Sequence, residues 1–120
     1  MELKEKVNPI KITDEETGKV YILDFNRETV KFAEDRGFTW DDIGERTATL
    51  VPLIWYTAFR RYDPRIGLDK TSKMLEDIGG LKPKWIKRLH ELWDQALAPL
   101  IGEDDDDESV KNAKMTVELD

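Results

Sequence analysis

The chain has 120 residues, 39% of them hydrophobic and none of them cysteine, so it has room for one domain with a modest core and no thiolate chemistry. The net charge is −7, and residues 103–120 carry −6 of it through eight acidic residues and two lysines. This distribution argues against general DNA binding, because phosphate neutralisation needs clustered lysine and arginine. No apolar run approaches the roughly 18 residues of a membrane span, and residues 1–6 lack the apolar segment of a signal peptide, so we expect a soluble, intracellular protein.

The first predicted element is a β-hairpin. Ile10 and Ile12 on one side and residues 19–23 on the other are β-rich runs, and they flank a turn at residues 13–18. Gly18 in that turn can adopt a positive φ. Since a lone two-stranded hairpin is marginally stable in water, we expect it to pack on helices.

A short helix is predicted over residues 27–36. Asn26 is a suitable N-cap, and Phe25 and Val30 have the spacing of a hydrophobic staple. Gly37 follows the last helical residue, where a left-handed conformation ends many helices, and Phe38 can fold back onto the last turn.

The next stretch, residues 39–62, predicts one long amphipathic helix. Thr39 is a good N-cap, and Asp41 and Asp42 suit the positive end of the helix dipole. Pro52 should kink the helix near residues 48–51 or split it there. Apolar residues recur at helical spacing along one face: Trp40, Ile43, Leu50, Val51, Ile54, Trp55, Ala58, Phe59 and Tyr62.

The same helix has a second apolar strip on the opposite face. Leu53 and Tyr56 lie there, with Arg60 one turn further on. One interpretation is that a neighbouring helix covers Leu53 and Tyr56. The other is that Leu53, Tyr56 and Arg60 form a partner-binding strip, since aromatic residues and arginine often anchor interfaces.

Two further helices complete the predicted body. After a loop at residues 62–67, Asp69 or a neighbour caps a helix that runs to Ile78 and is ended by Gly79 and Gly80. Pro83 suits the first position of the last helix, and Pro99 should distort its last turn. The residues expected to be buried in these two helices are Leu68, Met74, Leu75, Ile78, Trp85, Ile86, Leu89, Leu92, Trp93, Ala96, Leu97 and Leu100.

The predicted fold is therefore mainly α (α+β), with an N-terminal β-hairpin and about four helices in one domain over residues 1–102. Its expected core centres are Trp40, Trp55, Phe59, Trp85, Leu89 and Trp93. Residues 103–120 form an acidic tail that we expect to be disordered, because like charges at this density repel. The tail is either a solubilising segment, a docking tail or a cover for basic residues, and residues 115–119 have mild β character that suits pairing with an exposed edge.

No catalytic, cofactor-binding or metal site is expected, and we predict that the chain is not an enzyme. His90 is the only histidine and belongs to the edge of an apolar stripe, while Asp41 and Asp42 are explained by a helix start. The acidic run lacks the glycine and terminal glutamate of an EF-hand loop. Two small basic patches were considered for nucleic acid and set aside, because neighbouring acids cancel most of their field: Arg60, Arg61 and Arg65, and Lys82, Lys84, Lys87 and Arg88.

Three stretches carry a resemblance to a known family. They are YILDFNRETV at residues 21–30, RGF at residues 36–38 and LVPLIWYTAFR at residues 50–60. They resemble tail assembly chaperones of long-tailed (siphovirus-type) bacteriophages and prophages of Gram-positive bacteria, in which an extended segment leads into a helical body. The similarity covers about residues 10–101.

The resemblance implies a protein without enzymatic activity that works in the host bacterial cytoplasm. Its partner would be the helical tape measure protein, with tail tube subunits as a second candidate and a homo-oligomer as an option. The alternative function is a small acidic phage-encoded inhibitor that mimics DNA. That alternative predicts carboxylates spread over a folded face, whereas here they concentrate in residues 103–120.

Overall fold

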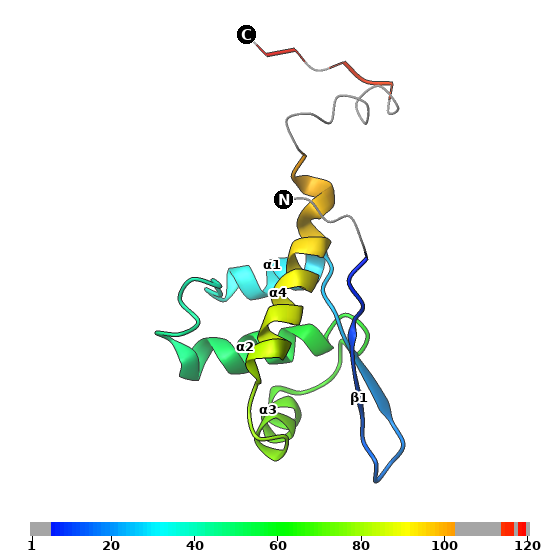
Figure 1. Cartoon of the computed structure of the whole chain (residues 1–120), viewed down its shortest axis with the longest axis vertical. Helices are drawn as coiled ribbons and strands as arrows, with labels where there is room; N and C mark the ends of the chain where they lie inside the picture. Colours follow the sequence, from blue (N-terminus) through cyan, green and yellow to red (C-terminus); the bar gives the residue numbers. More distant parts are fainter. Residues whose placement is uncertain (1–5, 103–113, 117, 120) are drawn as a thin grey trace.

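The computed structural model describes residues 6–102, 114–116 and 118–119. A two-stranded antiparallel hairpin is followed by four α-helices and a short 3-10 helix, which confirms the predicted fold class for the described body. Figure 1 shows the hairpin along one side of a helical body, with α4 running lengthwise across α1 and α2. The expected disorder of the acidic tail concerns residues that lie mostly outside the described ones. No helix in the described part of the chain is long and apolar enough to cross a membrane.

The hairpin pairs β1 (Ile10–Thr13) with β2 (Val20–Leu23), so that Ile12 lies opposite Tyr21. Its turn closes through a hydrogen bond from the Gly18 N–H to the Asp14 carbonyl, 2.7 Å long. Gly18 has φ +76°, as the sequence predicted. At the far end of β2 the Asp24 N–H donates to the Ala58 carbonyl over 3.0 Å, which ties the hairpin to α2.

Helix α1 (Arg27–Asp35) begins and ends as its sequence predicts. The Asn26 side chain accepts from the Thr29 N–H, and the Thr29 hydroxyl accepts from the Asn26 N–H, each over 2.9 Å. At the other end Gly37 has φ +85°, and the Phe38 N–H donates back to the Ala33 carbonyl over 3.0 Å. Both ends therefore satisfy backbone groups that a helix of this length leaves unpaired.

Helix α2 (Thr47–Phe59) is shorter than predicted, because residues 39–46 form turns. The Thr39 hydroxyl does accept from the Asp42 N–H, at 3.3 Å, but this bond closes a turn and not a helix. The apolar stripe is interrupted between Ile43 and Leu50, and Gly44 in that gap weakens a helix. Trp40 and Ile43 pack against the core from the turns instead. Of the two effects predicted for Pro52, a kink or a split near residues 48–51, the split is wrong, because α2 is continuous through Pro52, its sixth residue.

Two more helices and a 3-10 turn complete the body: α3 (Leu68–Asp77), α4 (Pro83–Leu97) and η1 (Ala98–Leu100). Gly79 and Gly80 end α3, where the Gly80 N–H donates to the Leu75 carbonyl over 2.9 Å. Pro83 is the first residue of α4, as predicted, and the helix tightens into the 3-10 turn around Pro99. Both proline expectations for this region are confirmed.

The core forms where α2 meets the hairpin, α1, α3 and α4. The Trp55 indole is 1% exposed and its Nε1 donates to the Thr71 carbonyl over 2.8 Å, which links α2 to α3. The predicted core residues Phe59, Leu89 and Trp93 are buried as well. Other predictions need correction: Trp40 and Trp85 are only half-buried, and Leu68 and Leu100 are 49% and 53% exposed because each lies at the end of its helix.

Candidate partner-binding surface

The strip predicted on α2 joins α1 in a cluster of two aromatic rings and two guanidinium groups. We call Phe32, Arg36, Tyr56 and Arg60 the α1–α2 cluster. The Phe32 and Tyr56 rings meet edge to face, with centroids 5.9 Å apart. The guanidinium carbon of Arg36 lies 3.4 Å from the Phe32 centroid and that of Arg60 lies 4.2 Å from it. The Phe32 ring thus makes cation–π contacts with both guanidinium groups.

Hydrogen bonds fix both guanidinium groups in place. The Nη1 of Arg60 donates to the Tyr56 hydroxyl over 3.0 Å and to the Pro64 carbonyl over 3.4 Å. The Nη1 of Arg36 donates to the Phe32 carbonyl over 3.1 Å, which satisfies a carbonyl in the last turn of α1. Within the described residues, neither guanidinium has a carboxylate at ion-pair distance. The cluster therefore presents ordered positive charge beside partly exposed aromatic rings.

The structure supports a part of each interpretation of the strip, because a neighbouring helix covers it only in part. Leu53 and Tyr56 are half-buried and pack against the edge of the core, and Arg60 is also half-buried. Helix α1 supplies the neighbouring surface through Phe32. Tyr56 and Arg60 are brought together by their hydrogen bond, while Leu53 lies about one turn earlier on α2.

Phe32 and Arg36 were not among the residues predicted for the partner-binding strip. Two signals were available: Phe32 falls outside the stripe formed by Val30 and Ala33, and Arg36 follows it at i+4, where helix side chains meet. What the sequence could not give is the packing of α1 against α2, which places Phe32 between the two arginines.

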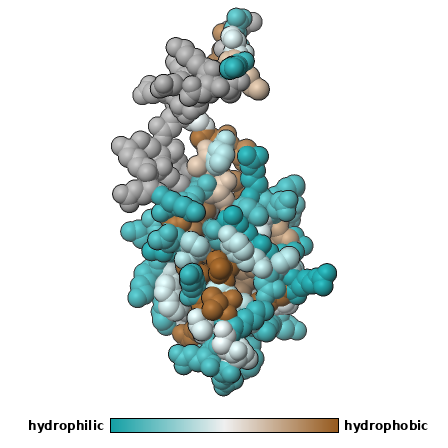
Figure 2. Space-filling model, turned by 90° about the vertical axis from the view of Figure 1, so that its right-hand side faces the viewer, coloured by the Kyte–Doolittle hydropathy of each residue, from teal (hydrophilic) through white to brown (hydrophobic). Residues whose placement is uncertain are grey.

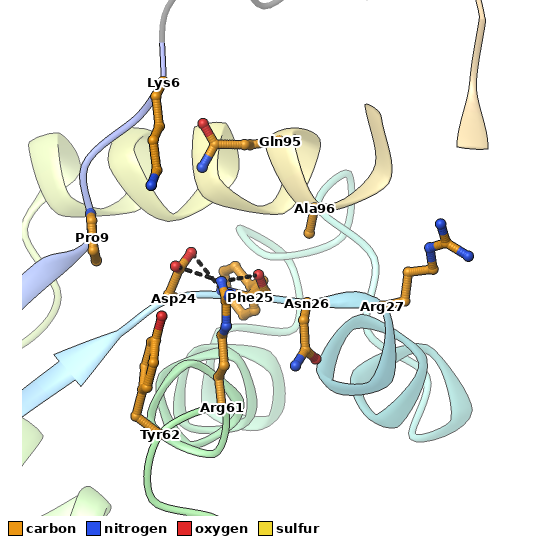
Figure 3. A pocket seen from close by; sticks show the side chains of 10 residues that line it. All are labelled: Lys6, Pro9, Asp24, Phe25, Asn26, Arg27, Arg61, Tyr62, Gln95 and Ala96. Carbon is orange, nitrogen blue, oxygen red and sulfur yellow. Dashed lines mark hydrogen bonds and ion pairs between the residues drawn. The ribbon is translucent and has the colours of Figure 1, made fainter. Parts of the chain in front are cut away.

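A separate pocket lies where β2 leads into α1. Its volume is about 450 Å³, and Asp24, Asn26, Arg61 and Gln95 are among the residues that line it. Figure 3 shows Arg61 pointing at Asp24: its Nη1 donates to Oδ2 of Asp24 over 2.6 Å and to the Phe25 carbonyl over 3.1 Å. Oδ1 of Asp24 accepts from the Phe25 N–H over 2.8 Å. This buried carboxylate is thus occupied by structural bonds, and it fixes the course of the chain from β2 to α1.

The comparison with protein families gives one result. The profile described as "Domain of unknown function (DUF5055)" matches residues 4–119. The chain belongs to this family. No curated protein and no solved structure matches the chain. The DUF5055 region contains the hairpin, all four helices and the α1–α2 cluster.

The basic patches considered in the sequence do not assemble in this DUF5055 chain. Arg60 bonds to Tyr56, whereas Arg61 bonds to Asp24 at the pocket of Figure 3. On α4, Arg88 donates to the Asn8 carbonyl over 3.1 Å, and Lys82 donates to the Gly79 carbonyl over 3.3 Å. These cations are therefore divided among several local contacts.

The single histidine has a packing role. The His90 ring stacks on Trp40 with centroids 4.5 Å apart and an angle of 14° between the planes. This stack covers one side of the half-buried indole. Over residues 6–102, 114–116 and 118–119, no three histidine or acidic side chains come together as a candidate metal site.

Proposed function

We propose that the protein is a tail assembly chaperone of a long-tailed phage or prophage. It binds the helical tape measure protein during tail morphogenesis in the host bacterial cytoplasm, with tail tube subunits as a second candidate partner. The resemblance of residues 10–101 to such chaperones supports this function, and the α1–α2 cluster is the observation that gives it a surface.

The chemistry of the cluster suits an acidic, amphipathic helix. Guanidinium groups pair with carboxylates through parallel hydrogen bonds, and Arg36 and Arg60 lack such partners among the described residues. The rings of Phe32 and Tyr56 offer apolar surface for one face of the incoming helix. A tape measure helix with apolar residues at i, i+3 and i+4 and a glutamate or aspartate beside them would match both features.

Preorganisation strengthens the argument. Binding normally costs free energy for ordering flexible side chains, and arginine is among the most flexible. Here Arg60 is already held by Tyr56 and by the Pro64 carbonyl, while Arg36 is held on the Phe32 ring. The partner therefore meets a surface whose charged groups are largely in place.

The test is a pull-down of the tape measure protein encoded in the same genome. We expect wild type to capture it, and both Tyr56→Ala and Arg60→Glu to lose most of the capture while keeping the circular dichroism spectrum of wild type. Arg65→Glu is the charge-matched control, because Arg65 is exposed and lies outside the cluster.

The outcomes separate the function from the surface. Failure of wild type to capture the tape measure protein would contradict the chaperone function. Capture by wild type and by both folded cluster variants alike would keep the function and reject this surface. An equal loss with Arg65→Glu would show that net charge, and not the cluster, controls binding.

A further inference from the structure

An apolar groove lies beside strand β1, and Trp55 of α2 is among the residues that line it. A hollow of about 150 Å³ there is lined by Ile10, Lys11, Ile12, Trp55, Ile78 and Trp85. A second hollow of about 330 Å³ continues from it past Pro9, Lys84 and Arg88, and it shares Ile10, Lys11 and Trp85. We call the two hollows together the β1 groove. Figure 2 shows the side of the molecule that carries the hairpin, where a few apolar side chains gather among hydrophilic ones.

The backbone edge of β1 along this groove is unpaired. The Asp14 N–H donates to the Lys19 carbonyl over 2.8 Å, so residues 14 and 19 face each other as a hydrogen-bonded pair. Alternation in an antiparallel ladder then makes Ile12 and Ile10 the next bonded positions, and the N–H and C=O groups of Lys11 and Thr13 point outward. Among the described residues β1 pairs only with β2, so its outward N–H groups have no neighbouring strand.

The edge is open over a short length only. Before β1, Gln95 bonds both backbone groups of Val7, accepting from its N–H over 2.6 Å and donating to its C=O over 3.2 Å. Arg88 covers the Asn8 carbonyl. An added strand therefore has room beside Pro9 to Thr13, with alternate side chains entering the hollow by Trp85.

One segment of this chain has the matching pattern. Met115, Val117 and Leu119 alternate with Thr116, Glu118 and Asp120, which is the period of a strand with one apolar and one acidic face. Met115 is 70% exposed and Leu119 is 93% exposed, so neither is covered in the single chain. The acidic residues complement the cations of the groove, Lys11, Lys84 and Arg88.

We propose that residues 115–119 of one copy add as a strand to the β1 edge of a second copy. The apolar side chains enter the β1 groove, and backbone hydrogen bonds form with Lys11 and Thr13. Reciprocal exchange closes a twofold pair in which each contact occurs twice. This inference is independent of the chaperone function, because it uses neither Phe32 nor the α1–α2 cluster.

Chain length and charge favour exchange between copies. The eleven residues 103–113 span up to about 40 Å when extended, enough to reach a neighbouring molecule. Folding back within one chain would instead bring residues 104–108, all acidic, alongside α4 past Asp94 and Glu91. Like charges at close range disfavour that path.

Crosslinking tests the contact directly, because the chain has no cysteine of its own. A Lys11→Cys chain is mixed with a larger, tagged Thr116→Cys chain, and a short bismaleimide is added. We expect a crosslinked heterodimer, and none when Glu34→Cys, an exposed position on α1, replaces Lys11→Cys. No heterodimer in the first mixture would overturn the proposal. The proposal would also be overturned if a chain carrying both Lys11→Cys and Thr116→Cys gave only an intramolecular crosslink and no crosslinked dimer.

Sedimentation equilibrium tests the backbone bonds. Lys11→Pro removes the outward N–H without touching a bond of the hairpin, and Lys11→Ala removes the same side chain but keeps the N–H. We expect Lys11→Ala to dimerise somewhat more weakly than wild type, because it loses one cation of the groove, and Lys11→Pro to dimerise about tenfold more weakly than Lys11→Ala. Wild type that stays monomeric up to millimolar concentration, or equal dimerisation of all three folded chains, would overturn the proposal.

Discussion

The α1–α2 cluster and the β1 groove offer partners different chemistry. In the cluster the helix backbones are hydrogen-bonded, and what remains exposed is side-chain chemistry, above all the guanidinium groups of Arg36 and Arg60. In the groove the backbone of β1 is itself exposed beside apolar side chains. On our proposals, the first surface would select a partner by charge and ring contacts, whereas the second would select an extended chain with alternating residues. Recognition of a helix and recognition of a strand would then use separate surfaces of one small domain.

Consecutive residues of α2 serve the two surfaces. Trp55 lines the β1 groove, and Tyr56 belongs to the cluster. Their directions differ because neighbouring residues on a helix are about 100° apart around its axis. Substitutions that disturb α2 should therefore weaken binding at both surfaces, whereas substitutions in α1 or β1 should weaken binding at one.

The largest effect is expected from Trp55→Ala, which should weaken both surfaces. The indole is almost fully buried and its Nε1 donates to the Thr71 carbonyl, so its removal leaves a cavity and breaks the bond between α2 and α3. We expect a loss of about 3–5 kcal/mol in the free energy of unfolding, measured by urea denaturation. Trp93→Ala should cost a similar amount, and half-buried Trp85→Ala distinctly less. Equal losses for Trp55→Ala and Trp85→Ala would contradict this placement of the core.

A second prediction concerns α1, which contributes to the cluster alone. Asn26→Ala removes the side-chain acceptor for the Thr29 N–H and should cost about 1 kcal/mol. The melting temperature should fall by about 4–8 °C in a domain of this size. Asn26→Asp keeps an acceptor at the N-cap and should stay close to wild type. If Asn26→Ala and Asn26→Asp have the same melting temperature, well below that of wild type, loss of the N-cap hydrogen bond does not explain the destabilisation.

The third prediction separates ring chemistry from packing. Phe32→Leu keeps apolar bulk beside α2 but removes the face on which Arg36 and Arg60 lie. We expect a loss of roughly 0.5–1 kcal/mol in stability and weaker capture of the tape measure protein. Dimerisation through the β1 groove should not change, so a shift in both binding assays would show that the two surfaces are coupled.

The smallest effect is expected from removing residues 103–120. At concentrations where the protein is monomeric, the melting temperature should stay within a few degrees of that of the full chain, because the strand that we propose forms only between two copies. A fall of about ten degrees, which corresponds to a couple of kcal/mol, would show that the segment docks on its own body instead.

Local signals explain which elements the sequence could predict. Asn26, Gly37, Gly79 and Pro83 act on their own backbone neighbours, and the starts and ends they predict are confirmed. The helix predicted over residues 39–46 is wrong, because capping residues were present but the apolar stripe is interrupted between Ile43 and Leu50, where Gly44 lies. Leu53, Tyr56 and Arg60 were found from helix spacing, yet the second ring and second guanidinium of the cluster come from α1.

The two hydrogen bonds between Gln95 and Val7 shorten the open edge of the sheet. An open sheet edge can pair with strands of other chains and so promote aggregation, and proteins commonly protect such edges. The Gln95 amide occupies both backbone groups of Val7 in the way a neighbouring strand would. These two bonds leave the edge open only beside Pro9 to Thr13. We therefore expect Gln95→Ala to lengthen the open edge and to make concentrated solutions more turbid than those of wild type.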